Sequence, residues 1–392
     1  MIYQDNTIRL AAPGGRGEAF TKLLRIPDVQ MIYVSALACT RHRSIDFVQM
    51  QRARRLSFLL FSEVDMVTGD YIEKTRQACA KIAAERSPSG IILLAGCQSA
   101  LLSTDYKLLS EEIGQEIGIP VRVHDGCRLC GLDDEEGGVS AIDRLLYAFL
   151  QPAEKSAAPS VNILGCAAVD ERGELFDALR AAGVGEIRTL SGCKSFADYQ
   201  DMARAHVNIA LTPQEAEIAA ELEETLGIPW VCLGGIYSAD ALAEGYRKLG
   251  ELLHTSIDVA AWQSRYQEAL ADAKAAVGDA PISVQGDGTL ARWLIEQGFA
   301  VKSLQLNPHQ GLTPEQRAWF GENAPSLRLE EPKRGGQGGP GGPGGRQGGP
   351  GGRPEGKRPG GKPGGEAVPT GWQGAVSVLH TLKRMAGGAR HE

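Results

Sequence analysis

The chain has 392 residues, of which 43% are hydrophobic and 23% charged, and its formal net charge is -7. These values are typical of a globular protein with two or three domains. The negative charge argues against nucleic acid as a main partner, because binding phosphate requires a basic face. No apolar stretch approaches the ~20 residues that span a membrane, and the N-terminus does not resemble a signal peptide. We therefore expect a cytoplasmic protein with no membrane partner.

The first notable segment is MIYVSALAC, residues 31–39, whose apolar and small side chains predict a buried strand that ends on Cys39. Three basic residues follow almost at once, namely Arg41, His42 and Arg43. Positive charge favours a thiolate, so Cys39 is a candidate ligand or nucleophile. The alternative is a cysteine that serves only packing.

The rest of the first block alternates strands and helices. Apolar runs predict strands at 90–95 and 119–123, helical patterns cover 71–85 and 105–116, and the run at 56–61 fits either a strand or a buried helix segment. Strands that alternate with helices of this length predict parallel βαβ units.

The same alternation returns after a polar linker at 151–160. The second block has predicted strands at 161–165, 206–211 and 229–234, separated by helices at 171–182 and 213–226. A shorter third unit follows, with a helix at 258–276, a strand at 281–285, a GDG turn, a helix at 289–297 and a strand at 300–304. The repetition predicts an α/β protein with parallel sheets.

The composition changes after Leu329. Residues 335–365 consist mostly of Gly, Pro, Arg and Lys, which cannot bury enough apolar surface to offset the entropy of ordering, so this tract is predicted to be a disordered linker. An RNA-binding tail is the alternative, although the tract has no aromatic residues for stacking on bases. Apolar residues at helical spacing return in 371–385. The predicted divisions are 1–155, 156–256, 257–330, 331–369 and 370–392.

Several cysteines follow predicted strands of the first block. Because the carboxyl ends of neighbouring parallel strands share one edge of a sheet, these thiols are expected to converge. They are Cys39, Cys97 and the pair Cys127 and Cys130. A convergent set of thiols predicts an iron–sulfur cluster or a zinc site, and CxxC spacing is also compatible with a redox dithiol.

The remaining candidates have weaker signals. His124 and Asp125 stand beside the CxxC pair and could transfer protons, although ordinary loop residues are an equal alternative. Cys79 is expected in a helix core, and Cys166, Cys193 and Cys232 in core or loop positions, with Cys166 the least certain because it also follows a strand. The GDG turn at 286–288 lacks the further features of a nucleotide-binding loop.

The order of these segments resembles the nitrogenase component 1 family. The resemblance rests on MIYVSALACTRHRS, SFLLFSEVDMVTGDYIEKTRQA, GIILLAGCQSALLSTDYKLL and IGIPVRVHDGCRLCG, together with the VNILG opening of the second block. It covers about residues 25–305 and implies repeated Rossmann-like three-layer domains. In this chain the third domain is expected to be curtailed, because the Gly-rich tract replaces much of it.

The resemblance also implies a chemistry. Cys39 and Cys97 match the family's cluster ligands, so a 4Fe–4S cluster is expected at a subunit interface, within a homodimer or a heterodimer with a related subunit. An ATP-dependent iron–sulfur reductase is the expected partner, and a small molecule or tetrapyrrole the expected substrate. Arg41, His42, His124 and Asp125 are the candidate catalytic residues.

Two departures limit the resemblance. The family has a further cysteine before the position of Cys39, and residues 1–38 contain none. Two protomers could supply four thiolates, or Cys127 or Cys130 could complete the set. The ligands of an iron–molybdenum cofactor are missing, which argues against nitrogen fixation. A scaffold that carries a cluster without turnover, and a metal-free binding protein, are the alternative functions.

Overall fold

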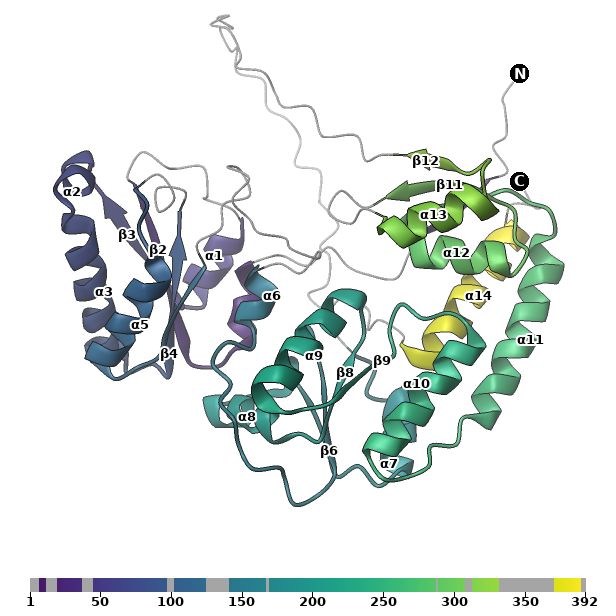
Figure 1. Ribbon diagram of the computed structural model, residues 1–392, viewed down its shortest axis with the longest axis horizontal. Coiled ribbons are helices and arrows are strands. Elements are labelled where there is room, and N and C mark those ends of the chain that lie inside the picture. The colour runs from purple at the N-terminus through teal and green to yellow at the C-terminus, as the bar shows by residue number, and fades with distance from the viewer. Residues whose placement is uncertain are drawn as a thin grey trace, which may run out of the picture.

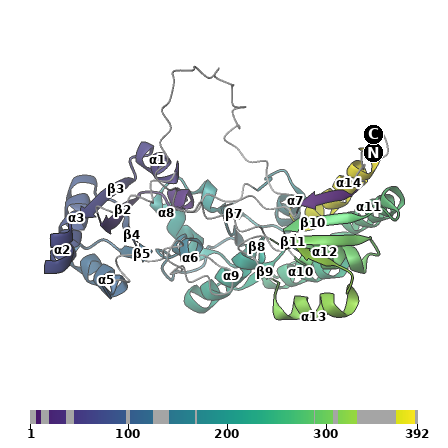
Figure 2. The same cartoon turned by 90° about the horizontal axis from the view of Figure 1, so that it is seen from above.

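A computed structural model describes residues 7–11, 20–36, 45–96, 102–124, 141–166, 169–286, 288–306, 312–330 and 370–388. Three four-stranded parallel sheets follow one another along the long axis of the molecule, each with helices beside it (Figure 1). The view from above shows the same succession (Figure 2). The α/β class with repeated parallel sheets is therefore confirmed.

The first sheet has the strand order β3-β2-β4-β5. Its strands are β2 (Val29–Ala36), β3 (Leu56–Phe61), β4 (Gly90–Ala95) and β5 (Val121–His124). Its helices are η1 (Phe20–Arg25), α1 (Ile45–Arg52), α2 (Glu63–Thr68), α3 (Asp70–Arg86), α5 (Tyr106–Ile117) and α6 (Ala141–Leu145). The two central strands are buried almost throughout, as their continuous apolar runs predict.

The ambiguous run at 56–61 is a strand and not a helix. Among the described strands it lies at one edge of the first sheet, where Phe58 and Leu60 are exposed while Leu56 and Phe61 are buried. Its alternating burial follows from this position, because an edge strand keeps part of its surface in contact with water.

The second sheet has the order β7-β6-β8-β9. Its strands are β6 (Ser160–Ile163), β7 (Glu186–Thr189), β8 (Val207–Ala210) and β9 (Trp230–Cys232). Its helices are α7 (Glu174–Ala181), η4 (Leu190–Gly192), α8 (Phe196–Gln200), η5 (Asp201–Arg204), α9 (Pro213–Leu226) and α10 (Ala239–Leu252). Strand β7 was not predicted, because it is a short edge strand of sequence EIRT with one strongly apolar residue.

The third sheet has the order β1-β10-β11-β12. Its strands are β1 (Ile8–Ala11), β10 (Ile282–Gly286), β11 (Val301–Leu306) and β12 (Arg328–Glu330). The helices of this part are α11 (Ala260–Val277), α12 (Gly288–Glu296), α13 (Pro314–Asn323) and α14 (Gly371–Gly388).

The third sheet is more complete than the sequence pattern indicated. Strands β1 and β12, which the pattern did not show, bring it to four strands, the same number as in the other two sheets. Residues 1–155 were assigned to the first domain, yet β1 pairs with β10, with Ile8 opposite Ile282. This pairing has no local signal, because its two partners lie far apart in the chain. The domain boundaries as such stay a prediction.

Two large cores connect the sheets. One contains Met31 of β2 together with Leu222 of α9, so it runs from the first sheet into the second. The other contains Val161 of β6, Val284 of β10 and Trp372 of α14, so it joins the second sheet to the third. None of the described helices combines the length and the apolar character that a membrane crossing needs.

Candidate functional site

The carboxyl edge of the first sheet is where the sequence predicts a metal centre. Strands β2 and β4 are parallel neighbours at the middle of this sheet, with Val34 opposite Ala95. The amide of Gly96 donates to the carbonyl of Val34 at 2.9 Å, so the pairing continues one residue beyond β4. The strand order reverses between β2 and β4, and such a switch point is the usual ligand position in an open parallel sheet.

The candidate thiols follow these two strands. Cys39 comes three residues after the last residue of β2, and Cys97 comes two residues after the last residue of β4. Seven of the eight candidate site residues lie outside the described ranges: Cys39, Arg41, His42, Cys97, Asp125, Cys127 and Cys130. Among the described residues, no three side chains of the metal-binding types are grouped so that they could hold a metal ion.

His124, the eighth candidate, is the last residue of β5 and pairs with Leu94 of β4. Its side chain is 4% exposed, and its ring meets Phe20 edge-on with the ring centroids 5.6 Å apart. The imidazole therefore lies in the interior, under the start of η1. Its predicted role in proton transfer stays a prediction.

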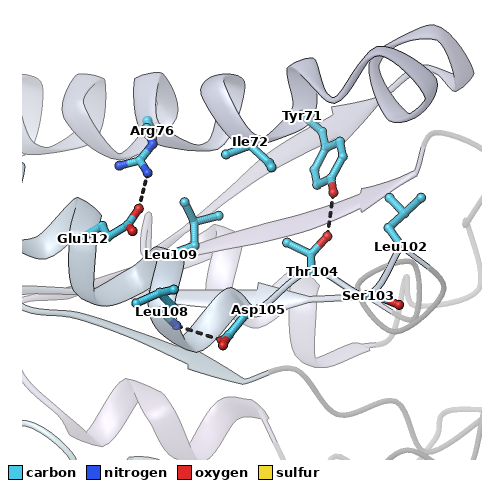
Figure 3. A pocket seen from close by; sticks show the side chains of 10 residues that line it. All are labelled: Tyr71, Ile72, Arg76, Leu102, Ser103, Thr104, Asp105, Leu108, Leu109 and Glu112. Atoms are coloured by element: carbon cyan, nitrogen blue, oxygen red, sulfur yellow. Dashed lines mark hydrogen bonds and ion pairs between the residues drawn. The ribbon is translucent and has the colours of Figure 1, made fainter.

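A groove of about 390 Å³ lies between α3 and α5 (Figure 3). Several of its polar side chains have partners within the groove lining. Tyr71 and Thr104 share a hydrogen bond of 2.6 Å, Arg76 pairs with Glu112, and Asp105 accepts from the amide of Leu108 as the cap of α5. The apolar part of the lining is formed by Ile72, Leu102, Leu108 and Leu109. We assign no chemistry to this groove, because these three interactions already serve the fold.

The second sheet has its own switch point, between β6 and β8. There Glu215, in the first turn of α9, accepts a 2.8 Å hydrogen bond from the amide of Leu211. Its Oε1 lies 1.8 Å from where a Cβ on residue 165 would stand, so a side chain there would displace the Glu215 carboxyl. Gly165 also has a φ of +93°, and its amide donates to the Tyr147 hydroxyl at 2.7 Å.

Sequence reasoning missed Glu215. The pattern Thr212-Pro-Gln-Glu215 is a signal that could have found it, because it marks Glu215 as a residue that caps a helix start.

Burial is the main cause of the raised pKa values of the two titratable groups at this edge, the Glu215 carboxyl and the Cys166 thiol. It raises the pKa of Glu215 to about 7, with Asp143 adding to the effect and the Leu211 amide and Lys22 opposing it. The neighbouring thiol of Cys166 is affected in the same direction, because burial raises its pKa to about 11. Lys22 and Asp143 form an ion pair of 2.6 Å. This edge thus holds a carboxyl that titrates near neutrality and a thiol that stays protonated.

The described cysteines outside the first edge behave largely as expected. Cys79 is fully buried in α3, and burial raises the pKa of its thiol to about 12. Cys166, Cys193 and Cys232 are half-buried free thiols that pack against the core shared by the first two sheets. Burial raises the pKa of each, so none of these four is an activated nucleophile.

Residues 19–306 match the family described as nitrogenase component 1 type oxidoreductase. The match covers most of the chain, and the chain belongs to this family of oxidoreductases. The family resemblance seen in the sequence is thereby confirmed.

The similarity to individual members of the family is low. The chain is 28% identical, over 198 residues, to one subunit of the light-independent protochlorophyllide reductase of Cereibacter sphaeroides. That alignment covers 48% of this chain and only 37% of the relative.

Two solved structures of nitrogenase Cp1 are also similar. The one at pH 6.5 has a TM-score of 0.44 and 19% identity and covers 80% of this chain and 68% of the other; the one at pH 5 has a TM-score of 0.45 and 20% identity and covers 80% and 70%. The family assignment depends on the sequence match and not on these structural likenesses.

Proposed function

We propose that the chain is the cluster-binding component of a two-component reductase, which receives electrons from an ATP-dependent iron–sulfur partner and reduces a small molecule. The observation that carries the proposal is the adjacency of β2 and β4 at the switch point of the first sheet. Chain segments that leave neighbouring parallel strands start from the same edge, and the segments here carry Cys39 and Cys97.

The donor chemistry fits an iron–sulfur cluster. Cys39 and Cys97 would hold it, since thiolates are the ligands that such clusters use, and a bound cluster would supply one-electron transfer. One chain offers two of these thiols, so a second copy or a related subunit would complete a set of four. Cys127 or Cys130 is the alternative source within the chain. Arg41, His42 and Arg43 would stabilise the anionic centre by their charge.

The relative supports a proposal for the substrate class. A subunit of a protochlorophyllide reductase supports a tetrapyrrole or another unsaturated small molecule as the substrate. His124 and Asp125 would hold the protons that a reduction consumes. Because the alignment spans 37% of that relative, its substrate and partners come to this chain only as proposals.

The first experiment measures iron and the EPR spectrum of the protein after anaerobic reconstitution. We expect the wild type to bind iron, and Cys39→Ser and Cys97→Ser each to lose most of it. Cys193→Ser, a half-buried thiol of the second sheet, is the matched control and should keep the wild-type content. An iron-free wild type after reconstitution, or full iron in both variants, would overturn the proposal.

A second experiment separates an enzyme from a scaffold that only carries the cluster. The reduced ATP-dependent partner and ATP are added to the loaded protein, and the cluster signal is followed by EPR. A change of oxidation state supports electron transfer. An unchanged signal, at a partner concentration where binding is demonstrated, supports the scaffold.

A further inference from the structure

The last helix of the chain, α14, ties the second and third sheets together. It packs against α11 and β1 on the side of the third sheet and against α7 and α10 on the side of the second. Its Trp372 is completely buried and meets Tyr266 of α11 edge-on, with the ring centroids 5.7 Å apart. Both views show α14 between α11 and the second sheet (Figure 1, Figure 2). The helix therefore contributes to the contact between the second and third sheets.

The first turn of α14 is seated on a buried glutamate, Glu174 of α7. The hydroxyl of Tyr246 donates to its Oε2 at 2.9 Å, and the backbone amide of Glu174 donates to Oε1 of Gln373, also at 2.9 Å. Gly371 has a φ of +60°, and a Cβ on it would lie 2.3 Å from the Tyr246 hydroxyl and 2.9 Å from Glu174 Oε2. The helix start, the tyrosine and the carboxyl thus fit together with no room for a side chain at residue 371.

The carboxyl is held where ionisation is costly. Glu174 is 3% exposed, and its burial raises its pKa to about 7. The hydroxyl of Tyr246 from α10, followed by the amides of Gln373 and Trp372 from α14, favours the ionised form and limits the rise. Asp177, on the same helix as Glu174, adds to the rise through its charge.

We propose that Glu174 is a proton-dependent latch for the C-terminal helix: its protonated carboxyl keeps α14 seated, and loss of that proton loosens the helix. The sign follows from comparing the two states. When α14 leaves, Glu174 gains access to water and its pKa returns toward the ordinary 4.5, so the open state binds fewer protons than the closed state. Opening is therefore favoured as the pH rises from 4.5 through 7. The latch acts through the fold and does not depend on the proposed function.

Hydrogen exchange of the full-length chain tests the latch. Peptides from residues 371–388 are followed by mass spectrometry at pH 6 and pH 8, with correction for the intrinsic exchange rate. For a pKa that moves between 4.5 and 7, we expect the opening constant of α14 to rise about tenfold between these conditions. In Glu174→Gln the dependence should vanish, because the amide does not ionise. The matched control is Glu171→Gln, an exposed position just before α7, which should keep the tenfold change.

Two results would overturn the latch: no pH dependence in the wild type, or the same dependence in Glu174→Gln. If Glu174→Gln does not fold, Tyr246→Phe decides. Removing this hydroxyl takes away the hydrogen bond that favours the ionised carboxyl, so the midpoint of opening should move to higher pH. An unmoved midpoint in a folded Tyr246→Phe variant would contradict the assignment to Glu174.

Discussion

The first and second sheets are built with the same strand order relative to the chain, in which the first and third strands of each unit flank the switch point. At the first sheet, the segments that follow those two strands carry Cys39 and Cys97, with three basic residues behind the first thiol. At the second sheet, Glu215 lies at the switch point, in close contact with Gly165 and next to Cys166. The same topology is thus followed in the chain by thiols and basic residues at the first sheet and by a half-buried carboxyl at the second. The side chains that follow the strands, and not the strand order, set the chemistry of each edge.

The largest effect should come from Gly165→Ala at the second edge. A Cβ there meets Glu215 Oε1 at 1.8 Å and also strains a φ of +93°, so we expect a loss of about 4 kcal/mol in the free energy of unfolding. Urea denaturation measures it. Gly118→Ala is the matched control, because its φ is +68° with open space around the added Cβ, and it should cost about 1–2 kcal/mol.

The double variant Gly165→Ala with Glu215→Ala isolates the contact between these two residues. Removing the carboxyl should recover the part of the free energy of unfolding that the steric clash costs, while the cost of the backbone strain at residue 165 remains. Additive losses in this cycle would show that Glu215 does not fill the switch point.

The next effect is a pH dependence that belongs to the second edge. The folded-state pKa of Glu215 is raised from 4.5 to about 7, so stability is complete below pH 4.5 and falls as the pH rises through 7. We expect Glu215→Gln to remove about 2.5 kcal/mol of this decline between pH 5 and pH 8, measured by urea denaturation at these two pH values. Glu224→Gln, an exposed position on the same helix, should leave the decline unchanged.

The smallest effect compares the thiols of the two edges in iron-free protein. A pKa of about 11 leaves Cys166 about a hundredfold less thiolate at pH 8 than an ordinary cysteine, and we propose that the bases that follow Cys39 in the chain favour its thiolate. Iodoacetamide should therefore label Cys39 at least about a hundredfold faster than Cys166, as peptide mass spectrometry can follow. Equal rates would remove the contrast between the edges.

Much of the fold could be predicted from the sequence because its central strands are continuous apolar runs. GIILLA became the buried strand β4, and helix α9 begins and ends at the residues that the pattern indicated, Pro213 and Leu226. The missed strands β1, β7 and β12 are short edge strands, and two of them are partly or wholly exposed. Such strands carry little apolar signal of their own and are defined by the neighbour with which they pair.

The sequence by itself determined the family, the parallel α/β class and the thiols that follow the first sheet's central strands, because these depend on local apolar periodicity and on residue order. Only the tertiary structure decided that β1 completes the third sheet, that Glu215 occupies the second switch point, and that Glu174 seats the last helix. Each of these involves side chains or backbone brought together from elements that local patterns do not connect. The raised pKa values of the two glutamates are likewise tertiary, since burial, which the sequence does not state, is their main cause.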